Sequence, residues 1–235
     1  MLPICEVAFL GRIAYADAWA LQDRLSAERA EGRAPDRLLL LEHPPTYTLG
    51  TSGRDEHLLL PADELARRGI AVHRVDRGGD ITYHGPGQIV GYPILQLERD
   101  HLRTNVVGYV RALERVLIAA LARYAIAAHT LDGLTGVWVQ TPAAPAKIAA
   151  IGVRVSVKAV TKHGFALNVN TDLSYFDGIV PCGIRDKGVT SMAAVLGEPQ
   201  DEAAVRAALA AAFAAEFGYA LVETADVFLP PTANA

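Results

Sequence analysis

One long helical face separates two groups of short β-type segments in this chain, and that order limits the folds open to it. Between 106 and 124 the apolar residues recur at helical spacing without interruption. A shorter amphipathic helical pattern precedes the first β-type segments and places on one face Tyr15, Ala18, Trp19, Gln22 and Leu25. Because helices and strands are grouped and do not alternate regularly, the pattern favours an α+β or mixed α/β arrangement over repeated βαβ units.

Local signals define the remaining elements. Leu38 to Leu41 is typical of a buried strand that ends before Pro44 and Pro45, and several short β-type runs separated by glycine turns follow between 69 and 97. The segments 136–140 and 147–161 resemble neighbouring strands joined by an exposed loop, and 164–173 resembles another.

Helix ends are marked by capping residues. Thr104 or Asn105 is the expected N-cap of the long helix, and Gly197 and Gly218 are expected to end the two C-terminal helices. Without a linker or an internal repeat, the 235 residues are expected to form one domain.

Charge and cysteine content exclude several classes of protein. The formal net charge is −4, from 22 basic and 26 acidic residues, which argues against general nucleic-acid binding. No apolar run approaches the roughly 18 residues of a membrane span, and the first residues lack the basic region of a signal peptide. Two cysteines do not make a disulfide framework, so we expect a protein of a reducing compartment, the cytoplasm, with no membrane association.

The second cysteine is a candidate nucleophile. Cys182 stands between Pro181 and Gly183, directly after an apolar run. A structural cysteine usually lies inside a helix or strand as a small hydrophobic residue. Here proline and glycine predict a turn, which presents the thiol at an edge. Asp172 and Asp177 nearby are expected to serve as capping or turn residues.

The segment 77–88, RGGDITYHGPGQ, is a candidate binding loop. Its four glycines allow positive φ and close approach of a ligand, although tight hairpin turns explain them equally well. It matches neither a phosphate loop nor a dinucleotide fingerprint. His84 is either a site residue or a core histidine bonded to a carbonyl. The histidines and cysteines show no metal-ligand spacing, so we expect no metal site.

Lys147 opens an otherwise apolar β-type run. A lysine at the start of a strand is usually solvated. In a cleft, however, desolvation lowers its pKa, and it then accepts a proton from a thiol or pairs with a thiolate. The 35 positions between Lys147 and Cys182 mean that only the fold can bring them together.

Several stretches together resemble the lipoyl(octanoyl) transferases. The matches are LLLLEHPPTYTLG (38–50), RGGDITYHGPGQIVGYPI (77–94), GVWV (136–139), KIAAIGVRV (147–155), HGFALNVNTDLSYFDGIVPCGI (163–184) and GVTSM (188–192). They cover about 36–195 in family order, followed by a helical segment and tail at 196–235. The resemblance implies a single catalytic domain with the fold of biotin and lipoate ligases, a mixed sheet flanked by helices.

The resemblance also implies the reaction and its residues. Octanoyl would pass from octanoyl-acyl carrier protein to a lysine of the lipoyl domains of 2-oxoacid dehydrogenase E2 subunits or of the glycine-cleavage H protein, without a cofactor. Cys182 corresponds to the nucleophile and Lys147 to its partner. The substrate pocket would be lined by Arg77, Gly78, Gly79, Asp80, Ile81, Thr82, Tyr83, His84, Ala150, Ile151, Gly152, Gly164, Phe165 and Ala166.

Three other functions compete with this interpretation. An ATP-dependent lipoate or biotin ligase needs a nucleotide and no cysteine nucleophile, so activity without ATP separates the two. A cysteine thioesterase uses water in place of the acceptor lysine, and a silent acyl-carrier-binding module forms no covalent adduct. Two departures from the family pattern, the missing aromatic residue before His163 and the long loop 140–146, leave the shape of the pocket open.

Overall fold

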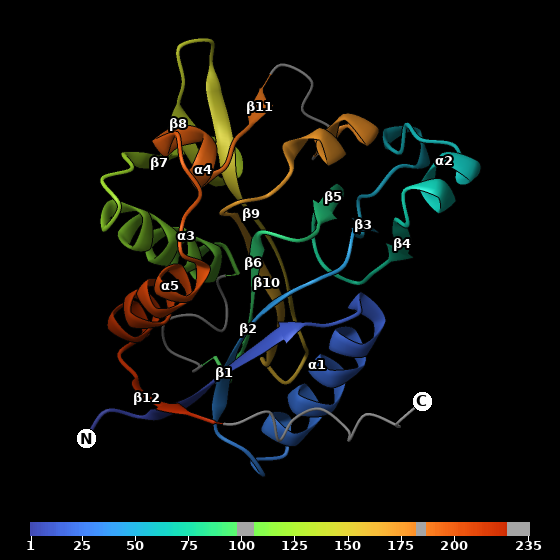
Figure 1. Ribbon diagram of the computed structural model, residues 1–235. Coiled ribbons are helices and arrows are strands. Elements are labelled where there is room, and N and C mark those ends of the chain that lie inside the picture. Colours follow the sequence, from blue (N-terminus) through green and yellow to red (C-terminus); the bar gives the residue numbers. More distant parts are fainter. Residues whose placement is uncertain (98–105, 182–186, 225–235) are drawn as a thin grey trace.

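The computed structural model describes residues 1–97, 106–181 and 187–224, and most of their strands lie in one large sheet (Figure 1). The order of this sheet is β12-β1-β2-β6-β10-β9-β8-β7, and β11 pairs with β9. In that order the strands are Ala220–Glu223, Ile4–Arg12, Asp36–Glu42, Gln88–Ile94, Thr161–Asn168, Pro145–Val155, Leu134–Gln140 and Ala128–Leu131, with β11 at Gly188–Val189. Parallel pairs at β12-β1-β2 and antiparallel pairs from β2 to β7 make it a mixed sheet.

A second sheet of three strands lies beside the first. Its order is β4-β3-β5, from Ala71–Arg74, Thr46–Leu49 and Ile81–His84. The short helix α2 (Ala62–Arg67) and the 3₁₀ turn η1 (Asp55–His57) connect β3 to β4. A second 3₁₀ turn, η2 (Leu173–Gly178), packs on a cluster of aromatic and aliphatic side chains that belongs to this small sheet.

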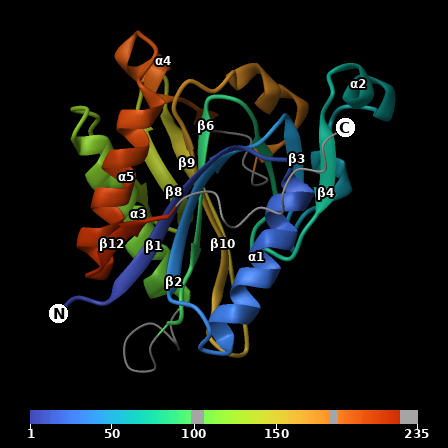
Figure 2. The same cartoon turned by 60° about the horizontal axis from the view of Figure 1, so that its bottom comes forward.

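Helices cover both faces of the large sheet. Helix α1 (Tyr15–Ala30) packs on β6 and β10, and α3 (Val106–Ala122) packs with α5 (Glu202–Phe217) on the other face. Figure 2 shows this layering, with α1 and the small sheet on one side and α3 and α5 on the other. The short helix α4 (Met192–Leu196) precedes α5. The expectation of a mixed sheet flanked by helices is therefore confirmed.

The two helical layers explain the unbroken apolar run in β2. Side chains alternate between the faces of a strand. Leu38 and Leu40 therefore join the core under α3 and α5, while Leu39 and Leu41 join the core under α1. All four are nearly inaccessible to solvent, so this strand carries no polar face.

The capping residues at the C-terminal helices have the expected geometry. Gly197 and Gly218 adopt left-handed φ values of 81° and 71° after α4 and α5. Ser191 and Asp201 accept backbone N–H groups at the two N-termini. The expected caps of α3 lie outside the described residues.

Two predicted strands are wrong in their extent. The run 147–161 is not continuous, because β9 ends at Val155 and the chain turns before β10 begins at Thr161. Ala159 has a φ of 59°, and the amide of Val160 donates to the Ser156 hydroxyl within this turn. The predicted run 164–173 is too long, because β10 ends at Asn168 and η2 begins at Leu173. The sequence pattern also did not predict β1, β3, α2, β7, β11 or β12. No helix among the described residues is long and apolar enough to cross a membrane.

Candidate active site

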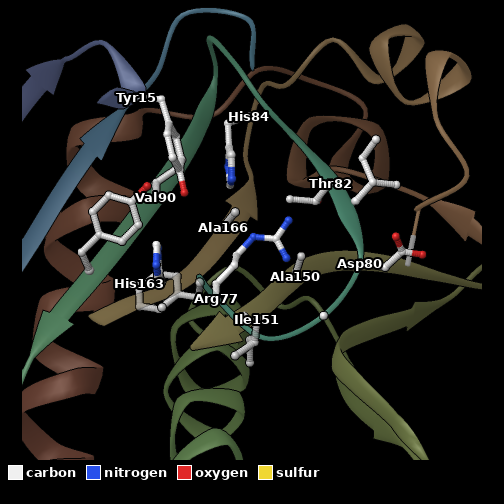
Figure 3. A pocket seen from close by; sticks show the side chains of 16 residues that line it. Tyr15, Arg77, Asp80, Thr82, His84, Val90, Ala150, Ile151, His163 and Ala166 are labelled. Atoms are coloured by element: carbon white, nitrogen blue, oxygen red, sulfur yellow. The ribbon is translucent and has the colours of Figure 1, made fainter. Parts of the chain in front are cut away.

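A cavity lies between the small sheet and the β9–β10 pair of the large sheet (Figure 3). This central cavity contains about 470 Å³ of space, its open mouth included. Its walls are Tyr15, Arg77, Gly79, Asp80, Ile81, Thr82, His84, Val90, Tyr92, Ala150, Ile151, Gly152, His163, Gly164, Phe165 and Ala166. Twelve of these sixteen were expected from the sequence, so segments separated by up to 89 positions meet at one cavity.

Two expected residues lie elsewhere. Gly78 lines a neighbouring, more open cavity, and its amide donates to the Val153 carbonyl at 2.9 Å. Tyr83 points to the opposite face of β5, where its ring stacks on Tyr175 at 4.8 Å between centroids. The alternation of side chains in a strand accounts for this, because Thr82 and His84 face the cavity.

The glycine-rich loop owes its path to backbone conformations and close contacts. Gly79 and Gly87 have left-handed φ values of 89° and 78°. Gly85 instead leaves room for the Tyr83 side chain, because a Cβ at this position would overlap the Tyr83 ring. At Gly152 on β9, a Cβ would lie 2.8 Å from the Gly78 carbonyl oxygen. The loop therefore lies directly on β9 and forms the cavity wall.

We expect Gly79→Ala to reduce the group transfer that the sequence resemblance implies roughly 10- to 10²-fold, because a small displacement of a substrate-positioning loop costs this much. The left-handed conformation also costs an alanine about 1–2 kcal/mol of stability. Gly32→Ala is the matched control, since Gly32 has a similar φ of 72° and no atom near its Cβ position. Equal losses of activity in the two variants, measured beside their melting temperatures, would show that Gly79 has only a folding role.

Buried tyrosines and histidines close one end of the central cavity. Figure 3 shows Tyr15 and His163 at this end and Asp80 at the other. The His43 Nδ1–H donates to the Ile13 carbonyl at 2.7 Å, so its Nε2 accepts the Tyr92 hydroxyl, also at 2.7 Å.

Burial keeps these imidazoles neutral. It lowers the pKa of His43 to about 4, lowers that of His84 well below the ordinary value, and also lowers that of His163. The side chains that line the closed end are therefore uncharged at neutral pH apart from Arg77, which suits an apolar ligand, and the Asp76 carboxylate that contacts His163 Nε2 at 2.7 Å lies behind this lining.

A chain of hydrogen bonds fixes the cavity wall to the segment around Lys147. Arg77 donates to the Thr48 carbonyl at 2.6 Å and to its hydroxyl at 2.8 Å. The His84 Nε2 contacts that hydroxyl, and its Nδ1–H donates to Gln88 Oε1 at 2.9 Å. The hydrogen-bond partners of this buried histidine are therefore side chains and not a backbone carbonyl. Through Gln88 and Asn168 the chain reaches Thr190, whose amide donates to the Lys147 carbonyl.

Lys147 is buried and not solvated. It is the third residue of β9 and is 8 % exposed. Its Nζ lies 4.8 Å from the centroid of the Trp138 ring on β8, within the range of a cation–π contact. Gly136 gives the side chain room, because a Cβ there would lie 3.3 Å from the lysine Cε.

A small cavity joins Lys147 to the central cavity. This junction cavity contains about 300 Å³ of space, its open part included, and shares Thr82, Ala150 and Ala166 with the central one. Its other walls are Gln88, Lys147, Asn168, Phe176, Pro181 and Val189. Pro181 is the residue directly before Cys182, which itself lies outside the described residues.

A third cavity opens from Lys147 toward solvent. This outer cavity contains about 1380 Å³ of space, its mouth included, and lies between the glycine-rich loop, η1 and α3. It shares Gly79, Asp80, Ile151 and Gly152 with the central cavity, and it includes Ser52, Arg54 and His57. Lys147 thus borders both the narrow junction cavity beside Pro181 and the wide outer cavity, which is open to solvent.

Sequence reasoning missed four residues of the central cavity. Tyr15 belongs to the predicted apolar face of a helix, and nothing local distinguishes its hydroxyl as a cavity group. Val90 and Tyr92 lie in a run that reads as core. His163 directly precedes the Gly-Phe-Ala stretch expected in the pocket and could have been included on that ground. Asp172, as expected, serves as a cap, accepting the Ser174 amide.

Comparisons with known proteins agree on one family. The model of the lipoyl protein ligase A/B catalytic domain matches residues 14–214. An octanoyltransferase of Chloroflexus aurantiacus is 54 % identical over 192 residues, which are 82 % of this chain and 84 % of the relative. An octanoyltransferase of Solibacter usitatus is 57 % identical over 191 residues, covering 81 % and 83 % of the two chains.

Solved structures show the same fold. A bipartite lipoate protein ligase from Thermoplasma acidophilum superimposes with a TM-score of 0.72 and covers 95 % of this chain and 87 % of its own. Its sequence identity is 16 %, so this likeness concerns the fold alone.

Proposed function

Because the chain belongs to the lipoyl protein ligase A/B catalytic domain family and, within it, to the octanoyltransferases, we propose that it transfers octanoyl from octanoyl-acyl carrier protein to a lysine of lipoyl domains. The acceptors are the lipoyl domains of 2-oxoacid dehydrogenase E2 subunits and the glycine-cleavage H protein. One observation carries the proposal: a buried lysine borders a junction cavity that leads to a central cavity, one end of which is lined by neutral side chains apart from Arg77. The junction cavity is also lined by the residue before Cys182.

The reaction proceeds through a cysteine thioester. Cys182 attacks the carbonyl of the donor thioester while Lys147 accepts its proton, and the donor carbon–sulfur bond breaks as the carrier sulfur takes up a proton and leaves as a thiol. The acyl chain occupies the central cavity. The neutral amine of the acceptor lysine then attacks the new thioester and gives up one proton as the amide forms, and Cys182 recovers its own proton from Lys147. A thioester is already activated, so neither ATP nor a cofactor is required.

Intact-mass measurement tests this function directly. Octanoyl-acyl carrier protein, mixed with the protein without ATP, is expected to add one octanoyl group that hydroxylamine removes. Addition of a lipoyl domain is expected to move the group to that domain. A requirement for ATP would favour a lipoate ligase, and loss of the octanoyl group to water at an undiminished rate without acceptor would favour a thioesterase.

The size of the cavity predicts selectivity for the acyl chain. Ala166 is 4 % exposed and lies where the junction and central cavities meet. Ala166→Leu is expected to block the passage and reduce octanoyl transfer on the order of 10²-fold, while an acetyl donor, which does not reach past this point, keeps most of its rate.

The ratio of octanoyl to acetyl rates within one sample is the measurement. This ratio does not depend on the fraction of the protein that is folded. That independence matters because overpacking a buried site costs roughly 1–3 kcal/mol of stability. An unchanged ratio in Ala166→Leu contradicts the assignment of the central cavity to the acyl chain.

A further inference from the structure

A histidine–aspartate pair lies beside the cavities, outside the cysteine–lysine chemistry. His57 Nδ1 is 2.5 Å from Asp80 Oδ2, and the two side chains are only 12 % and 11 % exposed. Asp80 Oδ1 accepts the backbone N–H of Arg54 at 3.2 Å. The carboxylate thus holds both the turn before η1 and the imidazole ring.

This geometry fixes the tautomer of the ring. An ionised carboxylate only accepts hydrogen bonds, so Nδ1 of His57 carries the proton, and Nε2 is the nitrogen that gains or loses one. The charged groups around the ring are Asp80, Glu56 with Oε1 4.0 Å from Nε2, and Arg54 and Lys147 in the same cavity. Glu56 is 70 % exposed and its contact with the ring is therefore weak.

The backbone of His57 is fixed as firmly as its ring. Its carbonyl accepts the amide of Val180 at 2.8 Å, and the next residues pair as a bridge between Leu58 and Ile179. The same segment, 178–181, reaches the junction cavity at Pro181. His57 and Lys147 therefore border the outer cavity from two sides, and Asp80 belongs to the walls of both the outer and the central cavity.

We propose that His57, oriented by Asp80, is the proton-transfer residue for the groups that enter and leave through the outer cavity. This inference rests on the proposed octanoyl transfer. In acylation, the carbon–sulfur bond of the donor breaks and protonated His57 gives its Nε2 proton to the leaving sulfur. In transfer, the carbon–nitrogen bond forms and neutral His57 takes the proton of the attacking amine.

The two steps balance over one cycle. Lys147 gains the cysteine proton in acylation and returns it in transfer, while His57 loses a proton in the first step and regains one in the second. A leaving group and the nucleophile that replaces it occupy the same position next to the acyl carbon, so one residue acts first as acid and then as base. The outer cavity is wide enough to admit either partner in turn.

A merely structural role for the pair predicts a different behaviour. His57 and Asp80 also join η1 to the glycine-rich loop, and loss of that contact would slow every donor alike. A proton donor matters only when the leaving sulfur needs a proton. An alkyl thiol such as that of pantetheine is at least as weak an acid as a cysteine side chain, whose pKa is about 8.5, so it leaves poorly as an anion at neutral pH. A more acidic aryl thiol leaves readily.

The test compares octanoyl-pantetheine with the phenyl thioester of octanoic acid in single-turnover acylation. His57→Asn is the decisive variant, because its amide N–H can still donate to Asp80 but no nitrogen titrates. We expect acylation by the pantetheine thioester to fall about 10²-fold or more, and acylation by the phenyl thioester to fall less than about 10-fold. His129→Asn, on β7 and outside all three cavities, is the control and is expected to leave both rates unchanged.

Equal losses with both donors would overturn the proposal in favour of a structural role, as would the absence of any loss. Should His57→Asn fail to fold, the unchanged protein still provides a test. The rate of its acylation by octanoyl-pantetheine, divided by the rate of its acylation by the phenyl thioester, is expected to fall as pH rises. A ratio that does not change with pH would overturn the proposal. Failure of the unchanged protein to pass octanoyl from either donor to a lipoyl domain would instead overturn the octanoyltransferase function itself.

Discussion

Cys182→Ala is expected to form no octanoyl adduct and to lose transfer to lipoyl domains by a factor approaching 10⁶, the order of loss when a covalent nucleophile is removed from an acyl-transfer enzyme. The physical reason is that none of the described residues that line the junction cavity with Lys147 is a cysteine, so none of them can store the acyl group as a thioester. Intact-mass spectra and single-turnover transfer rates with octanoyl-acyl carrier protein are the measurements.

Cys5 supplies the matched control. It is 0 % exposed in β1, and burial raises the pKa of its thiol to about 12, so almost no thiolate exists at neutral pH. Cys5→Ala is therefore expected to keep the adduct and the rate, apart from a small loss of stability. Full transfer by Cys182→Ala, or an adduct that moves to Cys5, would contradict the proposed nucleophile.

Substitution of Lys147 is expected to separate its two possible tasks. Lys147→Met keeps an unbranched side chain next to Trp138 and removes the amine, and both half-reactions should slow by about 10²–10⁴-fold. Lys147→Arg keeps a cation but cannot lose its proton. If Lys147 only stabilises a thiolate, arginine can replace it in part. If Lys147 moves protons, arginine cannot replace it.

Single-turnover acylation and transfer, each measured between pH 6 and 10, give the answer. We expect Lys147→Arg to acylate slowly and to transfer to the lipoyl domain more slowly still. A near-normal transfer rate in Lys147→Arg would leave Lys147 with an electrostatic role only. Melting temperatures of the variants are needed beside the rates, because arginine places a larger, planar group at a buried position.

Local sequence signals were sufficient where the structure is determined locally. Gly197 and Gly218, which the sequence predicts to end the C-terminal helices, are the C-caps of α4 and α5, and each cap depends on hydrogen bonds within a few residues. The buried run of β2 is likewise visible in the sequence, since a strand covered on both faces needs no polar residue. The resemblance then supplied the expected pocket residues, most of which meet at the central cavity.

Elements that depend on distant partners were not visible. The residues of β1 read as a short, interrupted apolar stretch, because its strand character comes from pairing with β2 and β12. Lys147 reads as a solvated lysine, and its burial comes from Trp138 of another strand and from the segment ending at Pro181. His57 has no local feature that marks it, since its contact with Asp80 joins two loops 23 positions apart.

The pairing of β1 with β12 has a consequence for how this chain folds during synthesis. Ile4 lies opposite Ala220 in this parallel pair, so the outer edge of β1 is completed only after the residues of β12 have been made. At about 5–20 residues per second, a ribosome needs roughly 10–40 s to add the residues between them. For that time the outer edge of β1 offers unpaired backbone groups to any other strand, the kind of edge at which aggregation begins.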